Sequence, residues 1–195
     1  MSTSRAESPD ELPWLPVQMP VNVRLIASTL PGRSLDIARQ RGWQEMSVAL
    51  MSAPERTKLV VDYLKTYARS LDSAQVDRIA AVEATANPLF LRAMLDELRL
   101  FGSHSRLPGE IDAYLACADV PALYARILER WERDYERDRP GLVRDAFANL
   151  WAARRGLSES ELRALLGTDA EPLPLAHWSP LRAAADAALL ERSGM

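Results

Sequence analysis

The sequence predicts a mostly α-helical protein that opens with a short α/β segment. From residue 52 onward, apolar residues recur at helical spacing, and the predicted helices start at typical capping residues. Before that point, residues 21–29 form a β-branched and almost continuously apolar run, which is typical of a buried parallel strand. We therefore expect one α/β unit followed by a series of packed helices.

The composition is that of an ordinary globular protein. The chain has 195 residues, of which 48% are hydrophobic and 26% charged, and its formal net charge is −3. No basic surplus favours nucleic acid or anionic lipid as a partner. The first ten residues lack the apolar core of a signal peptide, and no apolar run approaches the roughly 20 residues of a membrane span. We expect a cytoplasmic protein without a membrane partner.

The α/β segment contains two candidate strands. Residues 1–11 are predicted to be a disordered lead, and the three prolines of residues 12–20 predict an extended connector. A strand at 22–29, a helix at 34–41 and a second strand at 43–50 follow. Two strands do not make a stable sheet by themselves, so the remainder of the sheet must come from outside this chain.

The helical region shows clear start signals. Ser52 and Ser158 each precede a glutamate by three residues, which is the capping-box pattern. Asp72, Asn87 and Asp119 are further predicted N-caps. Pro88 would occupy the first helical position after Asn87, where proline is favoured.

The last region resembles a DNA-binding fold in outline. Three short predicted helices between residues 140 and 192 resemble a helix-turn-helix core, which a β-wing often completes. The sequence stops at Met195, where such a wing would begin. The pattern thus predicts a truncated winged helix.

No intact catalytic motif is present. The sequence has no Gly-rich phosphate loop followed by Lys-Ser/Thr, no dinucleotide fingerprint, no zinc-protease motif and no hydrolase elbow. Its adjacent carboxylates are predicted to be helix-surface charges, and the alternating charges of residues 131–139 a solvated face. Cys117 is predicted to be a small core residue, and with His104 and His177 it is too isolated for a zinc site. We expect the isolated chain to be neither an enzyme nor a metal binder.

Two segments could still contact a ligand. Ser28 and Thr29 end the first predicted strand and Arg33 follows, and ligands of open α/β sheets bind beyond the carboxyl ends of strands. Asn87 and Pro88 could present a rigid surface to a nucleotide base at a helix start. In both places, a purely local capping role is the alternative.

Four stretches in this order resemble a known family. They are VRLIASTLPG at 23–32, the Ser52 capping box with VDYL at 61–64, ANPLFL at 86–91, and LWAARRGLSESEL at 150–162. Together they resemble the C-terminal half of a NACHT-type module in STAND signal-transduction ATPases, which are related to AAA+ proteins, of the nephrocystin and telomerase-associated kind. The resemblance extends over residues 12–193.

The resemblance implies a domain organisation. Residues 12–50 would end the α/β core of a P-loop NTPase with its sensor strand, 51–118 would be a helical lid, and 119–195 a linker helix with the truncated winged helix. It also implies a cofactor-binding role for Ser28, Thr29, Arg33, Asn87 and Pro88. ATP or ADP with Mg²⁺ would bind only together with the missing core, which would be the partner of this chain, unless another copy or a different protein takes that place.

The sequence also departs from the family. The phosphate loop and the acidic magnesium strand are absent, Leu30 stands where many relatives have a sensor arginine, and Ala86 replaces a usual glycine. One alternative is a helical protein-interaction module that uses no nucleotide. The other is a winged-helix DNA-binding protein, which is disfavoured because Arg182 is the sole basic residue between Trp178 and Glu191.

Overall fold

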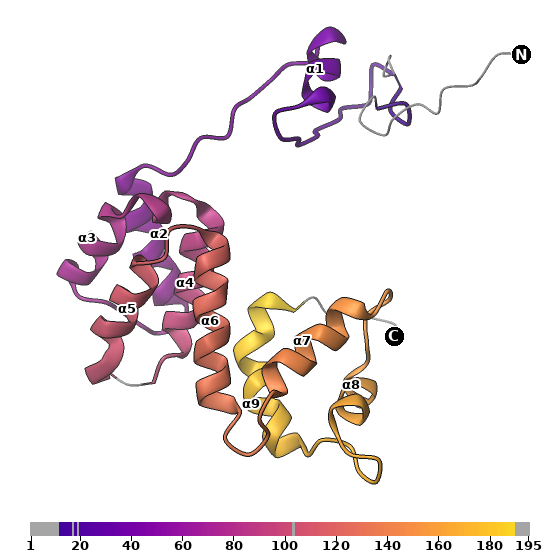
Figure 1. The fold of residues 1–195 in the computed structure, drawn as a ribbon. Coiled ribbons are helices and arrows are strands. Elements are labelled where there is room, and N and C mark those ends of the chain that lie inside the picture. Colours follow the sequence, from indigo (N-terminus) through magenta and orange to yellow (C-terminus); the bar gives the residue numbers. More distant parts are fainter. Residues whose placement is uncertain (1–11, 17, 19, 103, 190–195) are drawn as a thin grey trace, which may run out of the picture. The chain divides into compact units, whose positions relative to one another are not determined.

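The computed structural model describes residues 12–16, 18, 20–102 and 104–189, and divides the chain into two compact units. The first unit is Met1–Ala49 and contains α1 (Arg33–Gln40). The second unit is Leu50–Met195 and contains the other helices (Figure 1). The lead predicted for residues 1–11 and the end of the chain at 190–195 lie outside the described residues.

The α/β remnant predicted for the first unit is not supported. Residues 23–30 and 43–50 are extended but form no strand, and no strand occurs in any part of the chain that the structure describes. A β-strand exists only where its backbone groups bond to a neighbouring strand, and neither segment has one here. The mostly α-helical prediction is confirmed, and the two strands are wrong for this chain by itself.

Helices and short connections make up the second unit. Its α-helices are α2 (Ala53–Thr66), α3 (Ser73–Ala81), α4 (Pro88–Leu100), α5 (Leu107–Leu115), α6 (Val120–Tyr135), α7 (Leu142–Ala152), α8 (Glu159–Leu166) and α9 (Leu175–Ala185). Among its described residues, the 3₁₀ turns η2 (Glu83–Ala86), η3 (His104–Arg106) and η4 (Asp186–Ala188) accompany them.

The predicted N-caps are confirmed. Ser52 and Ser158 form complete capping boxes with Glu55 and Glu161. Asp72 and Asp119 each accept a hydrogen bond from the backbone N–H three residues later. These bonds satisfy N–H groups that have no partner inside the helix, so short polar side chains determine where the helices begin.

Helix α4 is the centre of the first helical layer. It contacts α2, α5, α6 and η2, while α2 pairs with α3 and α3 contacts α5 (Figure 1). Most of its side chains are therefore buried, namely Phe90, Leu91, Ala93, Met94, Leu95, Asp96, Glu97 and Leu98. Two helix pairs stacked in this way bury a continuous apolar core between them, as in helical-repeat proteins.

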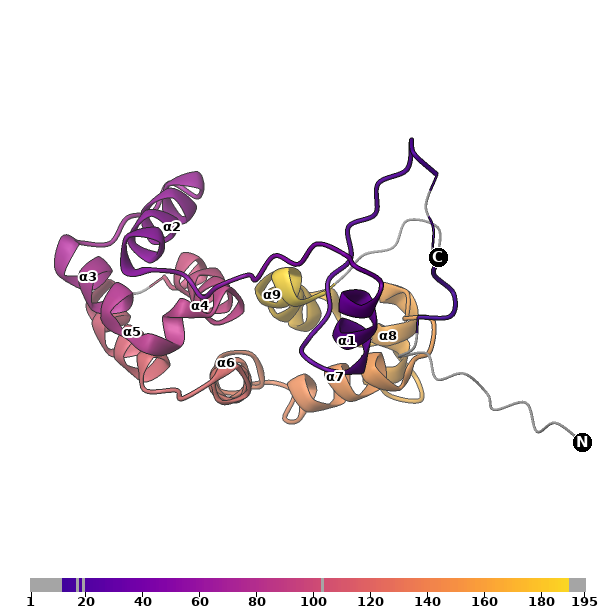
Figure 2. The same cartoon turned by 90° about the horizontal axis from the view of Figure 1, so that it is seen from above.

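Helix α6 joins this layer to the last three helices. It contacts α4 on one side and both α7 and α9 on the other, and in Figure 2 it is seen end-on between the two groups. Leu123, Ile127 and Trp131 of α6 are buried along this stripe. The winged helix predicted for this region is not supported, because residues 140–189 form α7, α8, α9 and η4 without any strand. Without strands there is no wing, and three helices remain.

The C-terminus of α2 carries an unusual residue. The N–H of Arg69 donates to Leu64 O and that of Ala68 to Lys65 O, both at 3.0 Å, which is the Schellman pattern. Its left-handed position, usually a glycine, is occupied by Ala68 with φ 53°. The Cβ of a non-glycine residue makes this conformation cost about 1–2 kcal/mol. The turn therefore stores strain that a glycine would release.

We expect Ala68→Gly to raise the free energy of unfolding by roughly 0.5–1 kcal/mol, because relief of the strain exceeds the entropy that glycine adds to the unfolded chain. Urea unfolding followed by circular dichroism measures this change. Ala125→Gly, at an exposed position inside α6, is the matched control and should lower stability by about 1 kcal/mol. Destabilisation by both substitutions would contradict the interpretation of Ala68.

Candidate functional site

The first group of predicted site residues lies in the first unit. Ser28 and Thr29 are exposed on the extended segment, and the Thr29 hydroxyl donates to the neighbouring Leu30 carbonyl at 3.1 Å. Arg33 is the first residue of α1 and is also exposed. Because residues 23–30 are not a strand, Ser28 and Thr29 do not end one here, and their nucleotide role remains a prediction.

The second group lies at the start of α4 in the second unit. Asn87 Oδ1 accepts hydrogen bonds from the N–H groups of Leu89 at 2.9 Å and Phe90 at 3.4 Å, which confirms the capping role. Pro88 is exposed at the first helical position. The N–H of Met51 donates to Ala86 O at 2.9 Å, so the chain that leaves residues 43–50 is attached directly beside this helix start.

A buried ion pair, which the sequence pattern did not predict, links α4 to α6. Glu97 and Arg130 are 3% and 4% exposed. Glu97 Oε2 accepts hydrogen bonds from Arg130 Nε at 2.8 Å, from Arg130 Nη2, and from Trp131 Nε1 at 3.3 Å. Burial raises the pKa of Glu97, and the nearby Arg130 partly opposes that shift. The interpretation of adjacent carboxylates as surface charges is therefore wrong for Glu97.

Asp96 is the centre of a second polar cluster, between α4 and α2. Its carboxylate accepts a hydrogen bond from the Tyr63 hydroxyl and pairs with Arg92 at 3.0 Å and Arg99 at 3.3 Å. The two guanidinium groups lie over the rings of Tyr63 and Tyr67, 4.5 and 4.4 Å from the centroids. Because every charge in it has a partner, this cluster supports the packing of α2 against α4.

The alternating charges at the end of α6 are only partly a solvated face. Glu136 accepts hydrogen bonds from the N–H groups of Gly141 at 2.7 Å and Val143 at 2.9 Å. Arg139 donates to Asp145 at 2.6 Å and to Leu166 O at 3.2 Å. These contacts cap α7 and connect it to α8, so the run fixes a corner of the fold.

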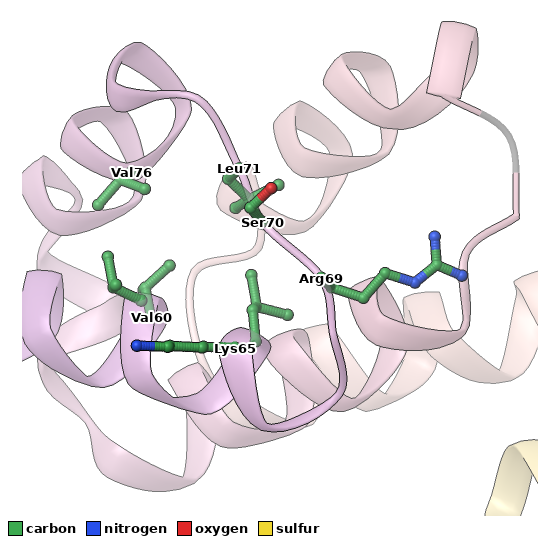
Figure 3. Close-up of a pocket in the computed structure, with 8 residues that line it drawn as sticks. Val60, Lys65, Arg69, Ser70, Leu71 and Val76 are labelled. Carbon is green, nitrogen blue, oxygen red and sulfur yellow. The ribbon is translucent and has the colours of Figure 1, made fainter.

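A small pocket lies between α2 and α3. Its volume is about 170 Å³, and its apolar wall comes from both helices and the loop that joins them. Figure 3 shows Val60 and Val76 facing one another across it, with Lys65 and Arg69 extending away from its edge in opposite directions. This pocket has no counterpart in the sequence prediction, because it depends on how α2 and α3 pack.

Other routes to chemistry find little support. No group of three or more His, Cys, Asp or Glu side chains that could hold a metal occurs among the residues described. Burial raises the pKa of the half-buried Cys117 thiol, whose Sγ lies 3.5 Å from Ala113 O, which disfavours a reactive thiolate. Within the described ranges, no helix has the length and apolar character required to cross a bilayer.

Comparisons with known proteins place the chain inside much longer relatives. It is 35% identical to a TPR repeat-containing protein of Dictyostelium discoideum over 191 residues, which cover 97% of this chain and 11% of that protein. It is 27% and 26% identical to telomerase protein component 1 of Mus musculus and Rattus norvegicus, over 80% of this chain and 6% of each relative. No protein-family model and no solved structure matches it.

These similarities agree in part with the sequence prediction. The four stretches suggested a relative of the telomerase-associated kind, and two proteins named telomerase protein component 1 match 80% of the chain. The chain spans about a tenth or less of the length of these relatives. The comparisons establish that this chain is similar to segments of much longer proteins. The structure shows that the chain is mostly helical.

We expect Arg130→Met to lower the free energy of unfolding at neutral pH by about 3–5 kcal/mol, because it leaves the Glu97 carboxylate buried without its cation. Urea unfolding at pH 7 measures this loss. Arg137→Met, at an exposed position just beyond α6, is the matched control and should change stability by less than about 0.5 kcal/mol.

The Arg130→Met defect should also depend on pH. Without Arg130, the effect of burial that already raises the pKa of Glu97 is less opposed, so the folded protein binds a proton more tightly than the unfolded chain. The penalty is then largest above the folded pKa and disappears as pH falls below the unfolded pKa of about 4.3. Unfolding at pH 5 should show a smaller difference from the unsubstituted protein than at pH 7. An equal difference at both values would rule out a buried Glu97 charge as its cause.

Proposed function

We propose that this chain is a helical protein-interaction module of a larger protein, and that its two extended segments bind the edge of a partner's β-sheet. The helical unit from residue 50 to 189 is the scaffold. Residues 23–30 and 43–50, on either side of α1, are the binding segments. The observation that carries the proposal is the exposed apolar surface of these segments.

The two segments expose more apolar surface than is usual for a soluble protein without a bound partner. Ile26 is 98% exposed and Val48 is 88% exposed. The same holds for Leu30, Met46 and Leu50. Several large exposed apolar side chains within two short segments favour an interaction site in a soluble protein.

Most backbone N–H groups of the two segments are also free to form hydrogen bonds with a partner. In the described chain, no N–H from residue 24 to 30 or from 44 to 50 donates to a backbone carbonyl. Unpaired extended backbone is a template for adding a strand, and main-chain hydrogen bonds then provide affinity while alternate side chains provide specificity. A partner that offers a sheet edge would satisfy both the backbone and the apolar side chains.

A second candidate function is the regulatory lid of a STAND-type nucleotide switch. The specific observation in its favour is the bond from Met51 N–H to Ala86 O, which ties the end of residues 43–50 to the exposed Asn87–Pro88 helix start. If residues 43–50 joined a partner's parallel sheet, this helix start would lie beyond the carboxyl end of that strand, where α/β proteins bind nucleotides. The similarity to telomerase protein component 1 is in line with this second candidate, since the sequence stretches resemble STAND proteins of the telomerase-associated kind. Under this candidate, the partner's sheet is the missing NTPase core.

The interaction module ranks first because it needs fewer assumptions. It requires the exposed segments and a protein with a sheet edge. The lid requires in addition a phosphate loop and magnesium carboxylates that this sequence does not contain. Both candidates share the same binding segments and the absence of catalysis by this chain alone.

We expect the isolated chain to self-associate through these segments, because another copy is the nearest substitute for a sheet edge. Sedimentation velocity at protein concentrations of roughly 10 to 200 μM, which detects Kd values on the order of 10⁻⁵ to 10⁻⁴ M, should show a concentration-dependent increase in mass. Hydrogen exchange should show residues 24–30 and 44–50 unprotected at the lowest concentration and partly protected at the highest.

The double variant Ile26→Lys/Val48→Lys should remain monomeric. Leu165→Lys/Leu175→Lys changes two exposed leucines of the helical unit and is the matched control, which should associate as before. Strong protection of residues 24–30 in the dilute monomer would mean that the segments already have partners within this chain. A monomer at every concentration, without protection, would also count against the proposal.

We also expect the purified chain to release no phosphate from ATP above the buffer rate. A phosphate-binding loop and a magnesium ion provide most of the transition-state stabilisation in ATP hydrolysis. This sequence contains neither the phosphate-loop motif nor the acidic strand that would bind magnesium. A phosphate-release assay with Mg²⁺ and ATP tests this. Activity that Thr29→Ala or Arg33→Ala abolishes would contradict the expectation and assign catalysis to this chain.

A further inference from the structure

The pocket between α2 and α3 has the size of one side chain. Its volume is about 170 Å³, whereas pockets for small molecules and cofactors usually measure about 300–1,000 Å³. An apolar cavity of about 150 Å³ holds a benzene molecule. A single aliphatic or aromatic side chain therefore fills this pocket, and a nucleotide does not fit.

The walls of the pocket are aliphatic. Val60 of α2 and Val76 of α3 are buried on its two sides (Figure 3), and the buried Leu64 of α2 also lines it. Val61 at the rim is 48% exposed, so the apolar surface continues out to the solvent. Water in such a pocket finds few hydrogen-bond partners, which favours its replacement by an apolar side chain.

The charges at the rim are both positive. Lys65 and Arg69 are exposed, and neither forms an ion pair with any carboxylate in the described part of the chain. Their side chains extend from the pocket edge in opposite directions (Figure 3). A peptide that places a carboxylate on each side of its apolar residue can therefore reach both cations.

The rim is held by a constrained turn. Lys65 is in the last turn of α2, and Arg69 follows the left-handed residue Ala68 in the Schellman turn. Two backbone hydrogen bonds, from Ala68 and Arg69, fix this turn. The backbone that carries the two cations is therefore already ordered. On binding, only the side chains of Lys65 and Arg69 lose conformational freedom.

We propose that this pocket is a docking site for a linear segment of a protein partner in which a leucine-like side chain is flanked by acidic residues. The aliphatic side chain packs against Val61 and the half-buried Leu71 at the mouth of the pocket, above the buried Val60 and Val76, and the flanking carboxylates pair with Lys65 and Arg69. This inference goes beyond the proposed function, because the pocket lies in the helical unit and shares no residue with the extended segments. The module would thus have two separate protein-binding surfaces.

The test uses three synthetic pentapeptides with blocked ends, Gly-Glu-Leu-Glu-Gly, Gly-Lys-Leu-Lys-Gly and Gly-Glu-Ala-Glu-Gly. Each is titrated into the full chain while methyl NMR signals of Val60, Val61, Leu64 and Val76 are recorded. The first peptide should shift these signals saturably, with a Kd on the order of 1 mM, since it buries one side chain and forms two exposed ion pairs. The other two peptides should bind at least about tenfold more weakly.

Variants separate the pocket from general charge attraction. Lys65→Glu/Arg69→Glu and Val61→Asp should each weaken the first peptide at least about tenfold, and circular dichroism should show an unchanged helix content because all three positions are exposed. Arg137→Glu and Leu165→Asp are the matched controls at exposed sites elsewhere and should leave binding unchanged. Ile26→Lys/Val48→Lys should also leave it unchanged, which distinguishes this site from the extended segments.

Three results would overturn the proposal. One is the absence of saturable shifts with the glutamate–leucine peptide. Another is equal binding of the lysine-flanked peptide, since that would remove the role of Lys65 and Arg69. The third is equal binding of the alanine peptide, since that would leave the cavity empty and reduce the interaction to surface charge.

Discussion

The arrangement of the helical unit depends on the neutralisation of one buried carboxylate. Glu97 lies on the central helix α4, and it is Arg130 and Trp131 of α6 that donate to it. Because an unpaired buried carboxylate is very costly, α4 and α6 must meet at this height and in this rotation. Helix α6 in turn contacts α7 and α9, so the position of the last three helices follows from the same pair. Arg130 extends the constraint along its own helix by also donating to Asp134 at 3.0 Å.

Local signals in the sequence were sufficient to predict a mostly helical chain and the starts of the helices that have side-chain caps. Ser52, Asp72, Asn87 and Ser158 cap helices through bonds to residues at most three positions away, and such bonds need no knowledge of the fold. Long-range polar contacts were not predictable in this way. Glu97 and Arg130 are 33 positions apart, and α4 reads as an ordinary amphipathic helix with two acidic residues near its end. Burial converts those carboxylates from surface charges into packing constraints only once α6 is in place.

The predicted strands failed for a different physical reason. Residues 21–29 have the composition of a buried strand, but composition describes the environment that a segment needs and does not provide the neighbour. Ile26 and Val48 are therefore exposed in this chain although their residue types favour burial. Of the candidate site, the capping role of Asn87 was predictable from its neighbour Pro88, whereas any contact that Ser28, Thr29 or Arg33 makes with a ligand depends on groups outside this sequence. The pocket of α2 and α3 could not be predicted, since its walls come from side chains on two packed helices.

The hydrogen bond between Met51 N–H and Ala86 O lies just after the boundary of the two units, so it determines where a pulling force on residues 43–50 would act. Tension along residues 43–50 would act first on Met51, which is held by this hydrogen bond, with about 1 kcal/mol of net stabilisation, and by the packing of its side chain against the core. Helix α4 behind it is anchored by most of its side chains, so it would stay in place while Met51 detached from Ala86. A load on residues 43–50 would therefore pass through Met51 and Ala86 to the start of α4, whose buried side chains hold it in the core.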